Sequence, residues 1–185
     1  LNYLMRGVDS LAFVFNGGEL TVADLDVLLK DVCLPAVEVN FVGCCSVKAT
    51  EAFAEYVKKA GYDLAEVKGS VEYDPFGKFA VTGKFTKGQD HVIANASKLI
   101  ELTADLKKFK TLAVNGKNFG NAGASAVQEL GFSLAQGAEY LTALTEKGVD
   151  IDAVAKNLKF NFSVSANYFM EIAKLRAARL LWAQI

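Results

Sequence analysis

Residues 159–185 read KFNFSVSANYFMEIAKLRAARLLWAQI, and the interpretation of the whole chain starts from this stretch. Residues 160–164 alternate aromatic or β-branched side chains with small polar ones, which is typical of a short β-strand. Residues 168–184 contain no glycine or proline and predict a helix, with Asn167 as its N-cap. A strand that leads directly into a long helix is the repeating unit of an α/β fold.

The predicted C-terminal helix has two apolar faces. The wider face is expected to lie on a sheet and consists of Phe169, Met170, Ala173, Ala177, Leu180 and Leu181. The second strip consists of Tyr168, Ile172, Leu175 and Trp182, interrupted by Arg176 and Arg179. A helix of this kind is expected to be covered twice, so the pattern implies a second layer, domain or subunit.

Four more pairs of strand and helix are predicted upstream. The strands are expected at residues 10–15, 36–42, 70–73 and 111–115, and the helices at 21–29, 47–60, 90–106 and about 124–145, with a short helix at 149–155. Thr21 and Asp24 have the spacing of a capping box, and Asp90 can cap the helix that follows it. The first strand is nearly continuously apolar, as expected for a strand buried on both faces. Strands that alternate with helices, without hairpin turns, predict parallel βαβ units.

Residues 78–89 are the least regular part of the chain, with two glycines and three lysines. They are predicted to form a solvated loop or hairpin, and a lid or partner contact is the alternative. Residues 116–124 carry three glycines, but their spacing matches neither of the phosphate-binding patterns GxxxxGK[ST] and GxGxxG, so no nucleotide site is predicted there.

Composition narrows the function. The net charge is −1 and 52% of the residues are hydrophobic, which argues against a nucleic-acid partner and places the apolar excess in a core or an interface. No apolar run is long enough to cross a bilayer. The cysteines, Cys33, Cys44 and Cys45, have no metal-site spacing; burial explains the adjacent pair, and a cytoplasmic location is expected. The single histidine, His91, is expected to be a surface or capping residue, so no metal site is predicted.

The run NYFMEIAKLRAARLLWA at residues 167–183 closely resembles the barrel helix of the methylmalonyl-CoA mutases. The resemblance extends to GVDS at 7–10, DLDVLL at 24–29, NAGA at 121–124 and GVDID at 148–152. It implies an α/β fold in which five strands correspond to the second to sixth strands of a (βα)8 TIM barrel. Because a complete barrel takes about 250 residues, residues 1–185 are expected to form a single partial barrel domain without the cobalamin-binding domain.

The resemblance also implies a function. Members of this family rearrange the carbon skeleton of acyl-CoA substrates, interconverting methylmalonyl-CoA and succinyl-CoA, with adenosylcobalamin as cofactor. Their catalytic subunits end the fifth barrel strand in Gly-Tyr-His, where this chain has Gly116, Lys117 and Asn118. Their Thr-x-Gln-x-Asp motif corresponds here to SVEYD at residues 70–74, with Glu72 in place of the glutamine. Glu72 and Asp74 are candidate partners for Lys117, because a buried lysine needs one.

These differences suggest that the chain belongs to the small, non-catalytic (beta) subunit of a heterodimeric mutase. No catalytic, cofactor-binding or metal-binding residue is assigned. Adenosylcobalamin is expected in the complex but not in this segment, and the expected partner is the large catalytic subunit. Two alternatives remain open: the catalytic barrel of a related acyl-CoA mutase with a different substrate preference, which would use Lys117 or Glu72 in new roles, and a non-enzymatic α/β scaffold.

Overall fold

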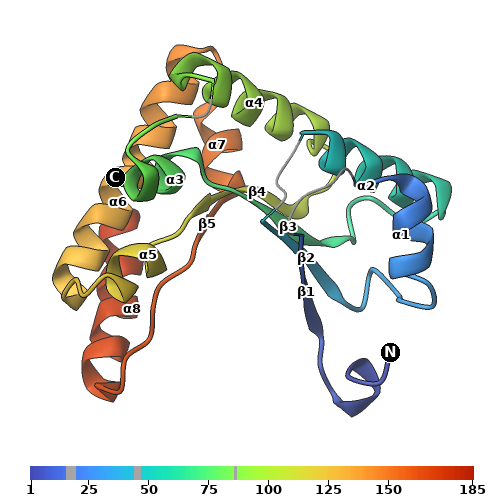
Figure 1. Cartoon of the computed structure of the whole chain (residues 1–185), viewed down its shortest axis with the longest axis horizontal. Coiled ribbons are helices and arrows are strands. Elements are labelled where there is room, and N and C mark those ends of the chain that lie inside the picture. Colours follow the sequence, from blue (N-terminus) through green and yellow to red (C-terminus); the bar gives the residue numbers. More distant parts are fainter. Residues whose placement is uncertain (16–19, 44–46, 86) are drawn as a thin grey trace. The chain divides into compact units, whose positions relative to one another are not determined.

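The computed structural model describes residues 1–15, 20–43, 47–85 and 87–185 (Figure 1). Its elements are a 3-10 helix (Leu4–Arg6), β1 (Ser10–Val14), α1 (Val22–Leu28), β2 (Glu38–Val42), α2 (Val47–Lys59), β3 (Lys68–Tyr73), α3 (Pro75–Thr82), α4 (Gln89–Leu102), β4 (Lys108–Val114), α5 (Lys117–Asn121), α6 (Ala126–Glu146), α7 (Ile151–Asn157), β5 (Leu158–Phe160) and α8 (Tyr168–Trp182). Cys44 and Cys45 lie outside the described residues, and Cys33 is exposed.

The five strands form a sheet in the order β1-β2-β3-β4-β5. The pairs β1–β2, β2–β3 and β3–β4 are parallel, with Ser10 opposite Glu38 and Val39 opposite Gly69. Within the described part of the chain the sheet is not closed into a barrel, and β1 and β5 are its edges. The predicted α/β class, with five parallel strands and alternating helices, is confirmed.

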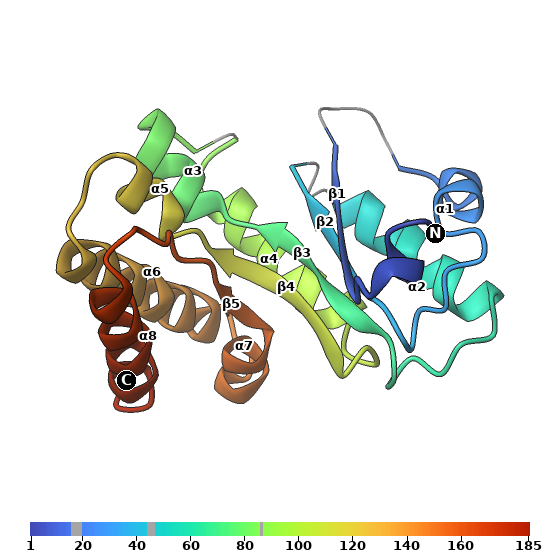
Figure 2. The ribbon, with the colours of Figure 1, turned by 90° about the horizontal axis from the view of Figure 1, so that it is seen from below.

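The chain forms two compact units. The first comprises residues Leu1–Tyr73 and Ala94–Leu112, and the second comprises Asp74–Ile93 and Ala113–Ile185. The ribbon in Figure 2 shows α6 and α8 of the second unit side by side, as they also are in Figure 1.

In the first unit, α1 and α2 cover one face of the strands. Phe53 of α2 is fully buried; its ring meets that of Phe41 of β2 edge to face at 5.0 Å between centroids and stacks on that of Phe109 of β4 at 5.2 Å. The other face is polar: Asn40 donates through Nδ2 to Oγ of Ser10 at 3.2 Å and accepts from Oγ of Ser70 at 2.5 Å. The prediction that β1 is buried on both faces is therefore wrong, because only one side of this edge strand lies against the helices and its residues alternate between exposed and half-buried.

Helix starts were predicted with mixed success. The predicted capping box of Thr21 and Asp24 is present at the start of α1. Asp150, for which no capping role was predicted, caps α7 through the N–H of Ala153. Asp90 lies within the first turn of α4 instead of capping it. Asn167 precedes α8 but its side chain makes no capping hydrogen bond.

Two segments differ from their predicted conformation. Residues 78–82, the first part of the predicted loop or hairpin 78–89, belong to α3, because Asp74 caps this helix through the N–H of Gly77 and Pro75 fits its first turn. The last strand ends at Phe160 instead of residue 164. The reason is that the N–H of Ser163 donates to the side chain of Glu129 at 2.6 Å and not to a neighbouring strand.

The orientation of α8 is the largest correction. Its contact with α6 is made by Ala178 against Leu130 and Leu134, with Trp182 beside them. Glu171 and Lys174 are buried on the same side. Phe169 and Leu180, which were predicted to lie on a sheet, are 80% and 63% exposed. The prediction failed because the helix buries a face that contains two charged residues.

Candidate functional site

The carboxyl ends of the last three strands are where a barrel of this type would place its functional groups. Asp74 directly follows β3, Asn115 follows β4 and Asn161 follows β5. Asn115 donates through Nδ2 to Oδ2 of Asp74, and Asn161 donates through Nδ2 to Oδ1 of Asn115, both at 2.9 Å. The three side chains therefore form one chain of hydrogen bonds in the second unit.

Asp74 is the centre of this network. Its Oδ2 also accepts from the backbone N–H of Asn115 at 3.0 Å. Its Oδ1 accepts from the N–H of Gly77 at 2.8 Å, from Nε2 of Gln136 at 2.6 Å and from the hydroxyl of Tyr140 at 3.1 Å. The carboxylate thus joins the end of β4 to α3 and α6.

The environment of Asp74 has an electrostatic consequence. Burial raises the pKa of Asp74 above 3.8, against the opposing effect of hydrogen bonds from Gly77, Asn115 and Tyr140. In the described part of the chain every donor to this carboxylate is neutral. Asp74 is therefore a carboxylate held in place by the dipoles of backbone and side-chain donors among the described residues.

Lys117 and Asn118, which the resemblance matches to the family's tyrosine and histidine, lie in the first turn of α5 and are half-buried. The backbone N–H of Lys117 donates to the carbonyl oxygen of Asn161 at 2.9 Å. Among the described residues, Asp74 has no ion pair or hydrogen bond with Lys117, so the structure does not join this candidate pair. Glu72 is a half-buried residue of the first compact unit.

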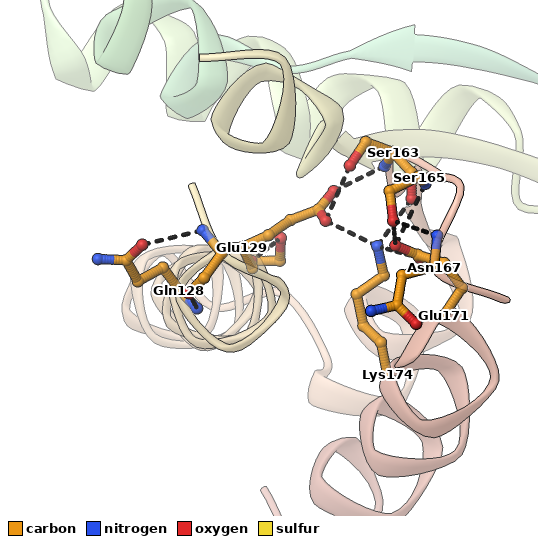
Figure 3. Close-up of polar contacts among 9 residues, drawn as sticks. Gln128, Glu129, Ser163, Ser165, Asn167, Glu171 and Lys174 are labelled. Carbon is orange, nitrogen blue, oxygen red and sulfur yellow. Dashed lines mark hydrogen bonds and ion pairs between the residues drawn. The ribbon is translucent and has the colours of Figure 1, made fainter. Parts of the chain in front are cut away.

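A second buried polar cluster lies between α6 and α8 and is drawn in Figure 3. Nζ of Lys174 lies 2.8 Å from Oε2 of Glu129 and 2.6 Å from Oε2 of Glu171. The side chains of Glu129 and Lys174 are each 2% exposed, and that of Glu171 is 11% exposed. The close contact to Oε2 of Glu171 is an ion pair without hydrogen-bond geometry. The three residues are called the ion cluster below.

Charges in the ion cluster stabilise one another. Burial of Lys174 would lower its pKa, but the ion pairs with Glu129 and Glu171 outweigh this effect and raise the pKa of Lys174. The ion pair with Lys174 and the hydrogen bonds from Ser165 lower the pKa of Glu171, against desolvation. Both residues are therefore held in their charged forms near neutral pH.

Sequence reasoning did not find either network. Asp74, Asn115 and Asn161 share one signal, a polar residue immediately after a strand. Glu171 and Lys174 are three residues apart on a helix, so they lie on one face of it. This spacing alone does not indicate that the face is buried, because the burial also depends on Glu129 of α6.

The described residues do not fit the cobalamin of the family. The family's cobalamin domain supplies a histidine, whereas the single histidine here, His91, is exposed on α4, as predicted for a surface residue. No group of three or more histidine, cysteine, aspartate or glutamate side chains that could hold a metal ion occurs in the portion that the structure describes. The prediction that this segment holds no cofactor stays a prediction. None of the helices within the described ranges is both long and apolar enough to cross a bilayer.

The comparisons with known proteins agree on one family. The family model for methylmalonyl-CoA mutase matches residues 20–185. The chain is 46% identical to the methylmalonyl-CoA mutase small subunit of Porphyromonas gingivalis and 36% identical to that of Streptomyces virginiae, in both cases over 100% of this chain and 30% of the relative. It is 32% identical to the large subunit of Porphyromonas gingivalis, over 89% of this chain and 23% of that protein.

The alignments also show how much of a whole protein is present. The chain spans about a third or less of the curated relatives that it matches, with shares of 30%, 30% and 23% for the three named above. The family match nevertheless covers nearly all of its residues, including those of both polar networks. The chain belongs to the methylmalonyl-CoA mutase family.

Proposed function

We propose that this chain is part of the small subunit of an adenosylcobalamin-dependent methylmalonyl-CoA mutase, an isomerase that interconverts methylmalonyl-CoA and succinyl-CoA. The observation that carries the proposal is the difference between two relatives from one organism: 46% identity to the small subunit of Porphyromonas gingivalis against 32% to its large subunit. Within the proposal, the partner is the large catalytic subunit, the residues form part of a (βα)8 barrel, and the complex is cytoplasmic.

The role proposed for this subunit is structural. Asn118 stands where the catalytic relatives carry a histidine, and an amide cannot transfer a proton near neutral pH. Support comes from the strand ends, where Asp74, Asn115 and Asn161 bind one another. Side chains whose hydrogen-bonding groups bind one another in this way support a structural role for these residues and not a role in binding or converting a substrate.

The test uses the full-length natural protein and its large subunit, purified separately and together. Each preparation receives adenosylcobalamin and methylmalonyl-CoA, and the succinyl-CoA formed is measured, with size-exclusion chromatography to detect the complex. We expect a one-to-one complex that turns over and no turnover by the small subunit alone. Turnover by this subunit alone, with this or another acyl-CoA, would identify a catalytic mutase with a different substrate preference and overturn the proposal. Failure to associate would overturn the partner assignment.

A further inference from the structure

Residues 163–167, which lead from the end of the β5 region into α8 and are called the connection below, are bound by buried charged side chains. Oε1 of Glu129 accepts from the N–H of Ser163 at 2.6 Å, and Nζ of Lys174 donates to the carbonyl oxygen of Ser163 at 2.7 Å. Oε1 of Glu171 accepts from the N–H of Ser165 at 3.2 Å and from its hydroxyl at 2.8 Å. Figure 3 shows both serines turned toward the ion cluster.

The same atoms hold the cluster together. Oε2 of Glu129 accepts from the hydroxyl of Ser163 at 2.9 Å as well as from Lys174 at 2.8 Å. Gly120 of α5 allows Ser163 and Glu129 to lie close to it. A Cβ at this position would lie 2.8 Å from Cβ of Ser163 and 3.1 Å from Cδ of Glu129. The connection cannot move away from α6 without separating charged groups that are almost completely buried.

This arrangement has an energetic consequence. An exposed loop usually opens at little cost, independently of the helices beside it. Here, opening residues 163–167 would leave carboxylates and an ammonium group buried with fewer partners, which is costly. Val164 is 77% exposed, yet it lies in a segment whose backbone is held by these buried charged side chains.

We propose that Lys174 is a positioning residue, which makes the connection 163–167 and α8 open as one cooperative unit on α6. The ion cluster is the device: Glu129 fixes the start of the connection, Glu171 fixes its middle, and Lys174 links both carboxylates to the carbonyl oxygen of Ser163. The inference depends only on these contacts and stands whether or not the chain acts in a mutase.

Native-state hydrogen exchange with residue-level mass spectrometry, on the full-length protein, tests the proposal. In the parent protein we expect the amides of Ser163 and Ser165 to exchange within about tenfold of the amides in the middle of α8. In Lys174→Met, exchange of the two serine amides should increase by about tenfold more than exchange of α8 does. The matched variant Gly137→Ala disturbs the contact between α6 and α8 without touching the ion cluster, and it should accelerate both sets of amides equally.

A milder pair of variants keeps the test decisive if Lys174→Met does not fold. Glu171→Gln retains an oxygen that can accept from the N–H of Ser165, so that amide should stay protected, whereas Glu171→Ala should release it. Equal exchange in these two variants, or serine amides that already exchange about a hundredfold faster than α8 in the parent protein, would overturn the proposal.

Discussion

Two neighbouring parts of the second unit bury carboxylates in opposite ways. Asp74 is surrounded by neutral donors from α3, β4 and α6, and burial raises its pKa. Glu171 forms an ion pair with Lys174, and this contact lowers the pKa of Glu171. Dipoles can hold a carboxylate in a precise position, but a cation next to it also favours its charged form.

The Asp74 network and the ion cluster also differ in how they respond to the loss of one side chain. Removing a neutral donor beside Asp74 leaves the other hydrogen bonds in place. Removing Lys174 leaves Glu129 and Glu171 with no cation, although both are almost fully buried. The ion cluster should therefore be the more sensitive of the two to substitution, and the following changes test that order.

Lys174→Met should have the largest effect. It keeps an unbranched side chain of similar length and removes the only cation of the ion cluster. We expect a loss of about 3–5 kcal/mol in the free energy of unfolding, because breaking a buried ion pair leaves uncompensated charge. Urea unfolding followed by circular dichroism measures it.

A matched substitution provides the control. Lys147 makes an ion pair with Asp90 at 3.0 Å, but both side chains are well exposed, at 51% and 93%. Lys147→Met should therefore cost less than about 1 kcal/mol. Similar losses in the two variants would mean that the ion cluster is not special.

Asp74→Asn should have the second largest effect. The new amide nitrogen can donate but not accept, so it would face the donors that now bind either Oδ1 or Oδ2 of the carboxylate. We expect a loss of about 1–3 kcal/mol in the free energy of unfolding, the usual cost of an unsatisfied buried polar group.

The control for this substitution is Asp150→Asn at the exposed N-cap of α7. Asparagine and aspartate are nearly equivalent caps, so the change there should be within about 0.5 kcal/mol. If Asp74→Asn lowers the free energy of unfolding no more than Asp150→Asn does, Asp74 acts only as the N-cap of α3 and does not stabilise the contact between the end of β4, α3 and α6.

The comparison also explains what could be predicted from the sequence. Hydrophobic runs and caps such as Thr21 predicted the alternation of strands and helices, because these signals are local. The ion cluster depends on Glu129 and Lys174, which are 45 positions apart, and no local pattern pairs them. The apolar periodicity of α8 therefore indicated the wrong buried face. Likewise, Asp74 was recognised as a strand-end residue, but its donors on α6 are 62 and 66 positions away.

Gly137→Ala tests the helix that contributes to both networks, since α6 carries Glu129, Gln136 and Tyr140. A Cβ at Gly137 would lie 2.8 Å from Cζ of Phe160 and 2.9 Å from Cζ3 of Trp182. We expect a loss of about 1–2 kcal/mol in the free energy of unfolding from overpacking. The fluorescence of the chain's single tryptophan would report the displacement directly.

Gly131→Ala is the control in the same helix, because its Cβ would meet nothing within 4 Å. This change should stabilise the protein by about 0.5–1 kcal/mol, as alanine is the better helix former. If Gly137→Ala stabilised the protein as Gly131→Ala is expected to, the packing of Gly137 against Phe160 and Trp182 would not be tight enough to exclude a methyl group.

The smallest effect expected is a difference in pH dependence between the two carboxylates. The pKa of Asp74 is raised above 3.8, so the stability of the parent protein relative to Asp74→Asn should be greatest below pH 3.8 and decrease as the pH rises from there. The pKa of Glu171 is lowered below 4.5, so the stability relative to Glu171→Gln should be present above pH 4.5 and be lost as the pH falls. Unfolding in urea at several pH values, with the exposed Glu139→Gln as a control, measures both differences. The two slopes should have opposite signs, because one carboxylate is paired with a cation and the other is held by neutral donors; slopes of the same sign would refute this distinction.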